Sequence, residues 1–197
     1  MTSGYQVDNG TIVINRELND LDLFVREFLD VLKKHSKYLI VSGYISISTG
    51  RVRGTEDVDI LIPLQTKEEF EKLFDDLTKA GFWCYQTDSK GEAYNHFRGL
   101  SSIRFAKKDQ MFPNIEAIPV TEMKHAQWFE LGHPQKYKVK DFEFLGSPLE
   151  FEITYKEQRL KGQKDLEDAR HLRTMFKSII DEEKLKTFKK MFSTWHE

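Results

Sequence analysis

Asp57 and Asp59 are the residues whose type and spacing point most directly to chemistry. They open the stretch Asp57-Val58-Asp59-Ile60-Leu61-Ile62-Pro63, which is typical of a strand that ends at its proline. Side chains alternate between the faces of a strand, so both carboxylates project to one side, about 7 Å apart along the backbone. Mg²⁺ prefers oxygen ligands and commonly uses one or two carboxylates plus substrate phosphates. The pair therefore predicts a magnesium site, although two such aspartates also occur on ordinary solvated strands.

The segment before this strand helps to distinguish a magnesium site from an ordinary solvated strand. A strand ends at Ser42-Gly43, and the stretch from Gly50 continues as Arg51-Val52-Arg53-Gly54-Thr55-Glu56 into the aspartates. This arrangement resembles the signature of the DNA polymerase β-like nucleotidyltransferase superfamily. In that family a strand ends in Gly-Gly or Gly-Ser, a short helix follows, and an Arg-x-Thr-x-Asp-x-Asp segment enters the next strand. Arg53, Thr55, Asp57 and Asp59 match, whereas Ser42 stands where the family often has a second glycine.

The same segment contains candidate groups for binding a triphosphate. A glycine between a strand and a helix lets backbone N–H groups and the helix dipole approach phosphate, which makes Ser42 and Gly43 candidates. Arg53 is a candidate partner for phosphate, and Thr55 is a candidate for fixing the loop. The alternatives are a plain strand-end turn, a solvated loop arginine and a threonine at a strand entry.

The resemblance also implies a third carboxylate and further cations. Active family members usually carry an acid on a neighbouring strand, and Glu116, flanked by apolar residues in Asn114-Ile115-Glu116-Ala117-Ile118, is the best candidate. The alternative is a surface glutamate on an edge strand. Small antibiotic-modifying and toxin–antitoxin members often carry a helical run Lys-x-x-Ala-x-Arg-x-Lys-Asp-x-x-Asp. Lys156, Arg159 and Lys164 match its cations, and such cations would neutralise a triphosphate and the departing pyrophosphate.

The elements that must position these residues follow from hydrophobic spacing. Apolar residues at spacings of three and four predict a helix over 21–32, and Thr66 with Glu69 forms a capping box that opens a helix ending near Gly81. We expect strands at 11–14, 38–41, 57–62, 82–86, 102–106, 114–120 and 137–145, the last interrupted near Asp141 by a bulge or turn. Ser147-Pro148-Leu149-Glu150 predicts a capped helix to about residue 161, followed by helices at 164–177 and 182–193.

The expected fold class is α+β, a nucleotidyltransferase fold with a short mixed sheet flanked by helices. Residues 1–146 would form the catalytic core, and 147–197 a helical C-terminal subdomain packed on it. The 197 residues suit one domain, and the net charge of -2 argues against strong non-specific nucleic-acid binding. The single cysteine, Cys84, excludes an internal disulfide, and the scattered histidines give little support to a zinc site. With no apolar leader or span, we expect no membrane partner and a cytoplasmic location.

These features predict a magnesium-dependent nucleotidyltransferase. It would move a nucleoside monophosphate from a nucleoside triphosphate to a hydroxyl acceptor and release pyrophosphate, using two Mg²⁺ ions on Asp57, Asp59 and Glu116. One alternative is a non-catalytic nucleotide-binding protein or toxin–antitoxin partner with the same fold. Another is a toxin that adds nucleotides to tRNA ends, which requires a local basic groove. The sequence names neither the acceptor, which can be a small molecule, protein or RNA, nor the preferred triphosphate nor the oligomeric state.

Overall fold

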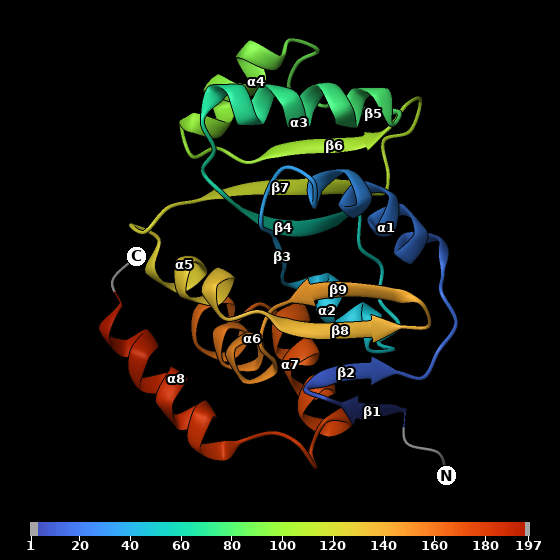
Figure 1. The fold of residues 1–197 in the computed structure, drawn as a ribbon. Coiled ribbons are helices and arrows are strands. Elements are labelled where there is room, and N and C mark those ends of the chain that lie inside the picture. The colour runs from blue at the N-terminus through green and yellow to red at the C-terminus, as the bar shows by residue number, and fades with distance from the viewer. Residues whose placement is uncertain (1–3, 196–197) are drawn as a thin grey trace.

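The computed structural model describes residues 4–195, which fold around one mixed β-sheet (Figure 1). Within these residues the sheet has nine strands in the order β1-β2-β8-β9-β3-β4-β7-β6-β5. The strands are β1 (Tyr5–Asp8), β2 (Thr11–Ile14), β3 (Leu39–Ile40), β4 (Asp57–Pro63), β5 (Phe82–Cys84), β6 (Ile103–Lys107), β7 (Asn114–Val120), β8 (Gln135–Val139) and β9 (Phe142–Gly146). The expected mixed sheet is confirmed, and it has more strands than the short sheet that the sequence predicts.

Helices connect and cover these strands. They are α1 (Asp20–Leu32), α2 (Gly43–Ser48), α3 (Lys67–Lys79), α4 (Lys90–Arg98), α5 (His125–Gly132), α6 (Leu149–Tyr155), a π-helical turn η1 (Lys156–Leu160), α7 (Gln163–Met175) and α8 (Glu182–Thr194). None of the helices within residues 4–195 is long and apolar enough to cross a membrane.

The middle of the sheet places β4 between β3 and β7. β4 is antiparallel to β3 and parallel to β7, in a register that pairs Asp59 with Glu116. Val58, Ile60 and Ile62 of β4 are buried in the main core, so the aspartates between them face the other side of the sheet. The alternation predicted for residues 57–62 is therefore present, and the neighbouring strand adds an acid to the aspartate side.

Aromatic side chains fill the core on the face opposite the aspartates. Phe28 of α1 contacts Phe82 of β5 and Phe105 of β6, and Phe74 of α3 also contacts Phe105. On the aspartate face, a smaller cluster joins Leu61 of β4 to β3 and β7. Ring contacts between Phe151 and Phe192 fasten α6 to α8 at the C-terminal end of the chain.

The structure tests the helix caps that the sequence predicts. Thr66 accepts a hydrogen bond from the Glu69 N–H and the Glu69 side chain reaches back, which confirms the predicted capping box of α3. Gly81 follows this helix at φ +83°, a conformation that favours glycine. The predicted cap at Ser147 is wrong, because α6 begins at Leu149 with Pro148 at its N-cap and no side-chain cap. Glu150 instead accepts a hydrogen bond from the N–H of Asp181 before α8.

The interruption expected near Asp141 is confirmed. The stretch 137–145 is a hairpin, since β8 and β9 pair antiparallel and the turn lies at Lys140-Asp141. Three elements differ from the expected layout, because the pattern did not predict β1, α4 or α5. β1 and α5 are short. The helices α4 and α5 each bury few apolar residues, so the hydrophobic periodicity of these two helices is weak. His96 and His125 lie in α4 and α5, and both are exposed.

Candidate active site

Three carboxylates meet at the N-terminal ends of β4 and β7. Asp57, Asp59 and Glu116 each offer an oxygen, and these oxygens all lie within 4.8 Å of one another. The cause is the strand register, because Asp59 is paired with Glu116 across the parallel ladder and Asp57 lies two residues earlier on the same face. Half-buried carboxylates at this spacing have the oxygen donors and the charge that hard divalent cations require.

The pKa of Asp59 is strongly shifted by burial and by the neighbouring carboxylates. Burial, together with the charges of Asp57 and Glu116, raises the pKa of its carboxyl to about 6, while a hydrogen bond from Ser42 partly offsets the increase. Like charges disfavour simultaneous ionisation unless a cation neutralises them. The site therefore carries an excess of negative charge, which a divalent cation would relieve.

Glu116 of β7 accepts hydrogen bonds from residues at the neighbouring strand β6. Ser102 Oγ donates to its Oε1 at 2.7 Å, and the Arg104 guanidinium donates to its Oε2 at 2.5 and 3.0 Å. Although burial alone would raise it, these hydrogen bonds lower the pKa of Glu116 below its ordinary value. Arg104 Nη2 also lies 3.9 Å from Asp57 Oδ2. Glu116 is thus ionised and oriented, with part of its charge balanced by Arg104.

Ser42 and Gly43 form the turn between β3 and α2. Ser42 has φ 63° and ψ -135°, a conformation that L-residues rarely adopt, and its N–H donates to Glu152 Oε2 at 3.4 Å. Gly43 lies against Arg53, because a Cβ added there would approach Arg53 Nη2 to 2.6 Å. A glycine is needed at this position so that the guanidinium can cover the turn.

Arg53, Thr55 and Lys164 line one pocket together with Asp57. Its volume is about 540 Å³. Thr55 Oγ1 donates to the Asp57 carbonyl at 2.8 Å and lies 3.3 Å from Asp57 Oδ1, so the hydroxyl fixes the loop against the carboxylate. Two cations beside a carboxylate that could bind a metal ion suit a polyanion such as a phosphate chain.

Lys156 and Arg159 do not enter this pocket. Lys156 is fully buried, with its Nζ 3.2 Å from Glu152 Oε1 and 3.1 Å from Asp168 Oδ2. Arg159 donates to the carbonyl of Phe192 at 2.8 Å and to that of Trp195, and so binds the end of α8. Of the three cations taken from the helical run, the structure places Lys164 alone beside Asp57.

Asp168 connects the loop before β4 to α7. It is fully buried and accepts from Arg51 and from Arg53, the latter at 2.6 Å, in addition to Lys156. This ion-paired cluster gives the loop of Arg53 a rigid support. Asp168 belongs to the helical run that carries the resemblance, whereas its partners Arg51 and Arg53 come from a segment more than a hundred residues away.

A second cavity of about 200 Å³ is also lined by one of the three carboxylates, Asp59. Asp59 and Ser42 form one wall, and Glu130 and Glu152 from α5 and α6 form another. Burial and the neighbouring Glu152 raise the pKa of Glu130 well above its ordinary value. Because its polar lining is rich in hydrogen-bond acceptors, this cavity does not suit phosphate.

Ser102, Arg104 and Glu152 are residues at the site that the sequence did not single out. Ser102, directly before β6, and Arg104, in β6, approach Glu116 with a spacing of two that matches one face of a strand. The sequence shows this spacing of two, but it does not show that β6 pairs with β7. Glu152 reaches Ser42 from a helix 110 residues later in the chain, and no sequence signal predicts that contact.

No family model and no curated protein matches the sequence. Among solved structures, an antigenic nucleotidyltransferase-like protein from Paracoccidioides brasiliensis aligns over 90% of this chain and 89% of its own, with a TM-score of 0.54 and 16% identity. The chain has a nucleotidyltransferase-like fold. At that identity the likeness establishes the fold and no more.

Two further solved structures align with the chain at lower similarity. ANT(2'')-Ia in complex with adenylyl-2''-tobramycin covers 89% of this chain and 98% of its own at 12% identity, with a TM-score of 0.49. A solution structure of the antibiotic-resistance factor ANT(2'')-Ia covers 88% and 91% at 13% identity, with a TM-score of 0.47.

Proposed function

We propose that this protein is a magnesium-dependent nucleotidyltransferase. It transfers a nucleoside monophosphate from a nucleoside triphosphate to a hydroxyl acceptor and releases pyrophosphate. The observation that carries the proposal is the convergence of Asp57, Asp59 and Glu116 within 4.8 Å on one face of the sheet, next to a pocket lined by Arg53 and Lys164. The nucleotidyltransferase-like fold is consistent with it.

The three carboxylates are the residues that would hold Mg²⁺, because they offer several oxygens at one point and their mutual repulsion favours a cation. When bound, the two Mg²⁺ ions of the proposal neutralise phosphate charge and help a hydroxyl to attack. Asp57 and Asp59 would hold the α-phosphate only indirectly, by binding the Mg²⁺ that contacts it. Glu116 completes the set and, as an ionised carboxylate, would accept the proton of the incoming hydroxyl.

The phosphate chain extends toward Arg53 and Lys164. Both cations line the pocket that also contains Asp57, and Thr55 holds the loop in place by its hydrogen bond to the Asp57 carbonyl. Charge complementarity there stabilises the departing pyrophosphate. Lys156 contributes indirectly, through Asp168 and Arg53, because it is buried away from the pocket.

The direct test is transfer from labelled triphosphates. Each α-labelled nucleoside triphosphate is incubated with Mg²⁺, the protein and a cell extract, and both the labelled product and pyrophosphate are measured. We expect label on an acceptor, and at least a hundredfold loss in Asp57→Asn and Asp59→Asn, as for removal of a major transition-state contact. Glu122→Gln, an exposed acid outside the carboxylate group, is the matched control. Transfer that persists in both aspartate variants would refute the mechanism.

A second function has one observation in its favour. Both oxygens of Glu116 already accept hydrogen bonds from Ser102 and Arg104, so the third carboxylate is partly neutralised. A non-catalytic protein that binds nucleotide, or a toxin–antitoxin partner, would retain the fold with such a site. Magnesium-dependent binding of a triphosphate, without transfer to any component of the extract, would support that function instead.

A further inference from the structure

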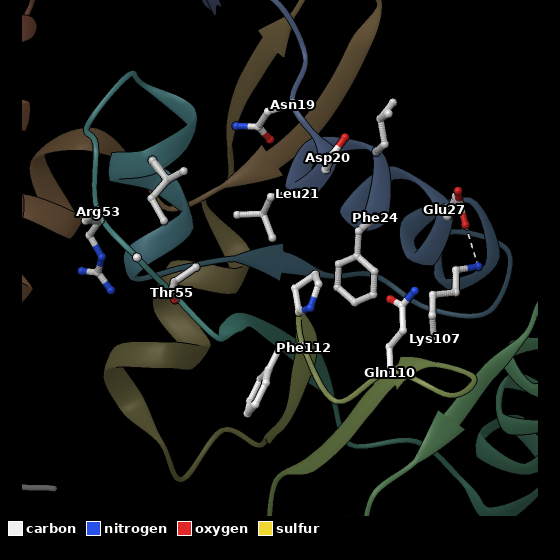
Figure 2. A pocket seen from close by; sticks show the side chains of 14 residues that line it. Asn19, Asp20, Leu21, Phe24, Glu27, Arg53, Thr55, Lys107, Gln110 and Phe112 are labelled. Atoms are coloured by element: carbon white, nitrogen blue, oxygen red, sulfur yellow. Dashed lines mark ion pairs between the residues drawn. The ribbon is translucent and has the colours of Figure 1, made fainter.

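A cavity of about 740 Å³ lies beside the loop that leads to the aspartates. It is bounded by the start of α1, the loop before β4 and the turn between β6 and β7. Figure 2 shows Leu21 and Phe24 of α1 on one side, Phe112 on another, and Arg53 with Thr55 at the far side. This volume falls in the range of small-molecule sites.

The lining is suited to a flat apolar ring. Leu21, Phe24, Ile47, Phe112 and Pro113 supply apolar and aromatic surface. Phe112 leaves 53% of its surface exposed, although an isolated aromatic on a turn gains little from contact with water. Stacking of a ring on Phe112 would cover that surface.

Two amides, Asn19 and Gln110, belong to the polar part of the lining, which also includes Asp20, Glu27 and Lys107. Asn19 uses its side-chain oxygen to cap α1 through the N–H of Asp22, which leaves its NH₂ group available. The side-chain amide of Gln110 makes no hydrogen bond within residues 4–195. Side-chain amides both donate and accept hydrogen bonds, so they can recognise the donors and acceptors along the edge of a nucleobase.

This cavity and the cationic pocket lie on the same loop before β4. Arg53, Gly54 and Thr55 line both, and Thr55 Oγ1 lies 3.3 Å from Asp57 Oδ1. The buried Nε of Arg53 has no hydrogen-bond partner among the described residues, so an acceptor atom of a ligand that crosses the loop would satisfy it. One molecule with an anionic part and a flat ring would have to cross this loop to contact both pockets, and Arg53 and Thr55 would touch it on the way.

We propose that this cavity binds the nucleobase of the triphosphate whose phosphates lie near Asp57, Arg53 and Lys164. The inference rests on the proposed function, since it assigns the base of the same substrate. The base stacks on Phe112 against the apolar wall of α1, and Gln110 and Asn19 contact its edge. The competing place for a base is the 200 Å³ cavity beside Asp59, where Gln127 and Glu130 provide acceptors.

The test compares ligands with and without a base. Calorimetry with Mg²⁺ measures the binding of ATP, GTP, CTP, UTP and inorganic tripolyphosphate to the full chain. We expect Phe112→Ala to weaken the best nucleoside triphosphate on the order of tenfold, which is typical for loss of one stacked base, and to leave tripolyphosphate unchanged. Gln110→Ala should change the order of preference among the four bases. Lys164→Ala should weaken both kinds of ligand.

Two variants serve as controls. Trp128→Ala removes a partly exposed aromatic of α5, outside this cavity, and should leave all affinities unchanged. Gln127→Ala probes the cavity beside Asp59. The inference is overturned if Phe112→Ala leaves triphosphate affinity unchanged, if it weakens tripolyphosphate equally, or if Gln127→Ala alone carries the loss. Absence of binding by triphosphates and by tripolyphosphate alike would instead refute the proposed function, and the base site with it.

Discussion

Arg53 Nη1 lies 2.6 Å from Asp168 Oδ2, which joins the loop before β4 to helix α7. Asp168 is fully buried and also contacts the buried Lys156 at 3.1 Å. An uncompensated buried charge is far more costly than the loss of an exposed pair. The support of the phosphate pocket therefore depends on one carboxylate from the C-terminal part of the chain.

Asp168→Ala should destabilise the fold by about 3–5 kcal/mol, because it leaves Lys156 and Arg53 without their shared partner. The matched control is Glu167→Ala, whose partly exposed carboxylate pairs with Arg51 and should contribute about 0–1 kcal/mol. Urea unfolding monitored by circular dichroism measures both. Equal, small effects would show that the cluster does not hold the loop.

Asp59→Asn should stabilise the metal-free protein. The carboxyl has a pKa of about 6 in the fold against an ordinary 3.8, so its ionised form costs stability at neutral pH. The gain should be about 1–3 kcal/mol at pH 7 and should vanish below pH 4, where the carboxyl is protonated in both states. Denaturation curves at pH 4 and pH 7 test this, with Glu122→Gln as a control that changes neither.

Mg²⁺ binding should release protons near pH 6. At that pH about half of the Asp59 carboxyls are protonated, since the pKa is about 6, and a bound cation favours the ionised form. Proton release should therefore approach half a proton per site at pH 6 and almost none at pH 8. Calorimetry in buffers of different ionisation enthalpy measures it. A release independent of pH would contradict the assignment of Asp59 as a ligand.

Asp22→Asn should weaken the fold at neutral pH. Burial alone would raise the pKa of Asp22, but the hydrogen bonds from Arg16, the Asn19 N–H and Tyr44 lower it below 3.8. Such a depressed pKa stabilises the fold above about pH 4, and this stabilisation is lost as the pH falls through the lowered value. The variant should cost about 3 kcal/mol at pH 7, and its difference from the parent should shrink toward pH 2. Acid titration of both proteins checks the trend.

Gly43→Ala should weaken triphosphate binding more than it weakens the fold. A Cβ there would meet Arg53 Nη2 at 2.6 Å, and the flexible guanidinium can move away from the turn and from the pocket. We expect a stability change below about 1 kcal/mol and a several-fold loss of affinity for ATP with Mg²⁺. Gly132→Ala, where a Cβ meets nothing within 4 Å, is the control. An unchanged affinity would separate Arg53 from nucleotide binding.

The sequence alone determined the features that depend on local geometry. Alternation along residues 57–62 placed Asp57 and Asp59 on one face, and Thr66 with Glu69 marked the start of α3, because both effects act within a few residues. The nucleotidyltransferase fold was also expected from the motif around Ser42–Asp59, and the structure shows it. The division of the chain at residue 146 stays a prediction.

Only the tertiary structure decided which distant groups share the site. Glu116 reaches Asp59 because β4 and β7 are parallel in that register, and no local pattern specifies strand register across 56 intervening positions. Lys156 and Arg159 have the same charge and helical context as Lys164, yet packing against Asp168 and α8 removes them from the pocket. The charge of a side chain is a property of the sequence. The direction in which that side chain points depends on what its helix packs against.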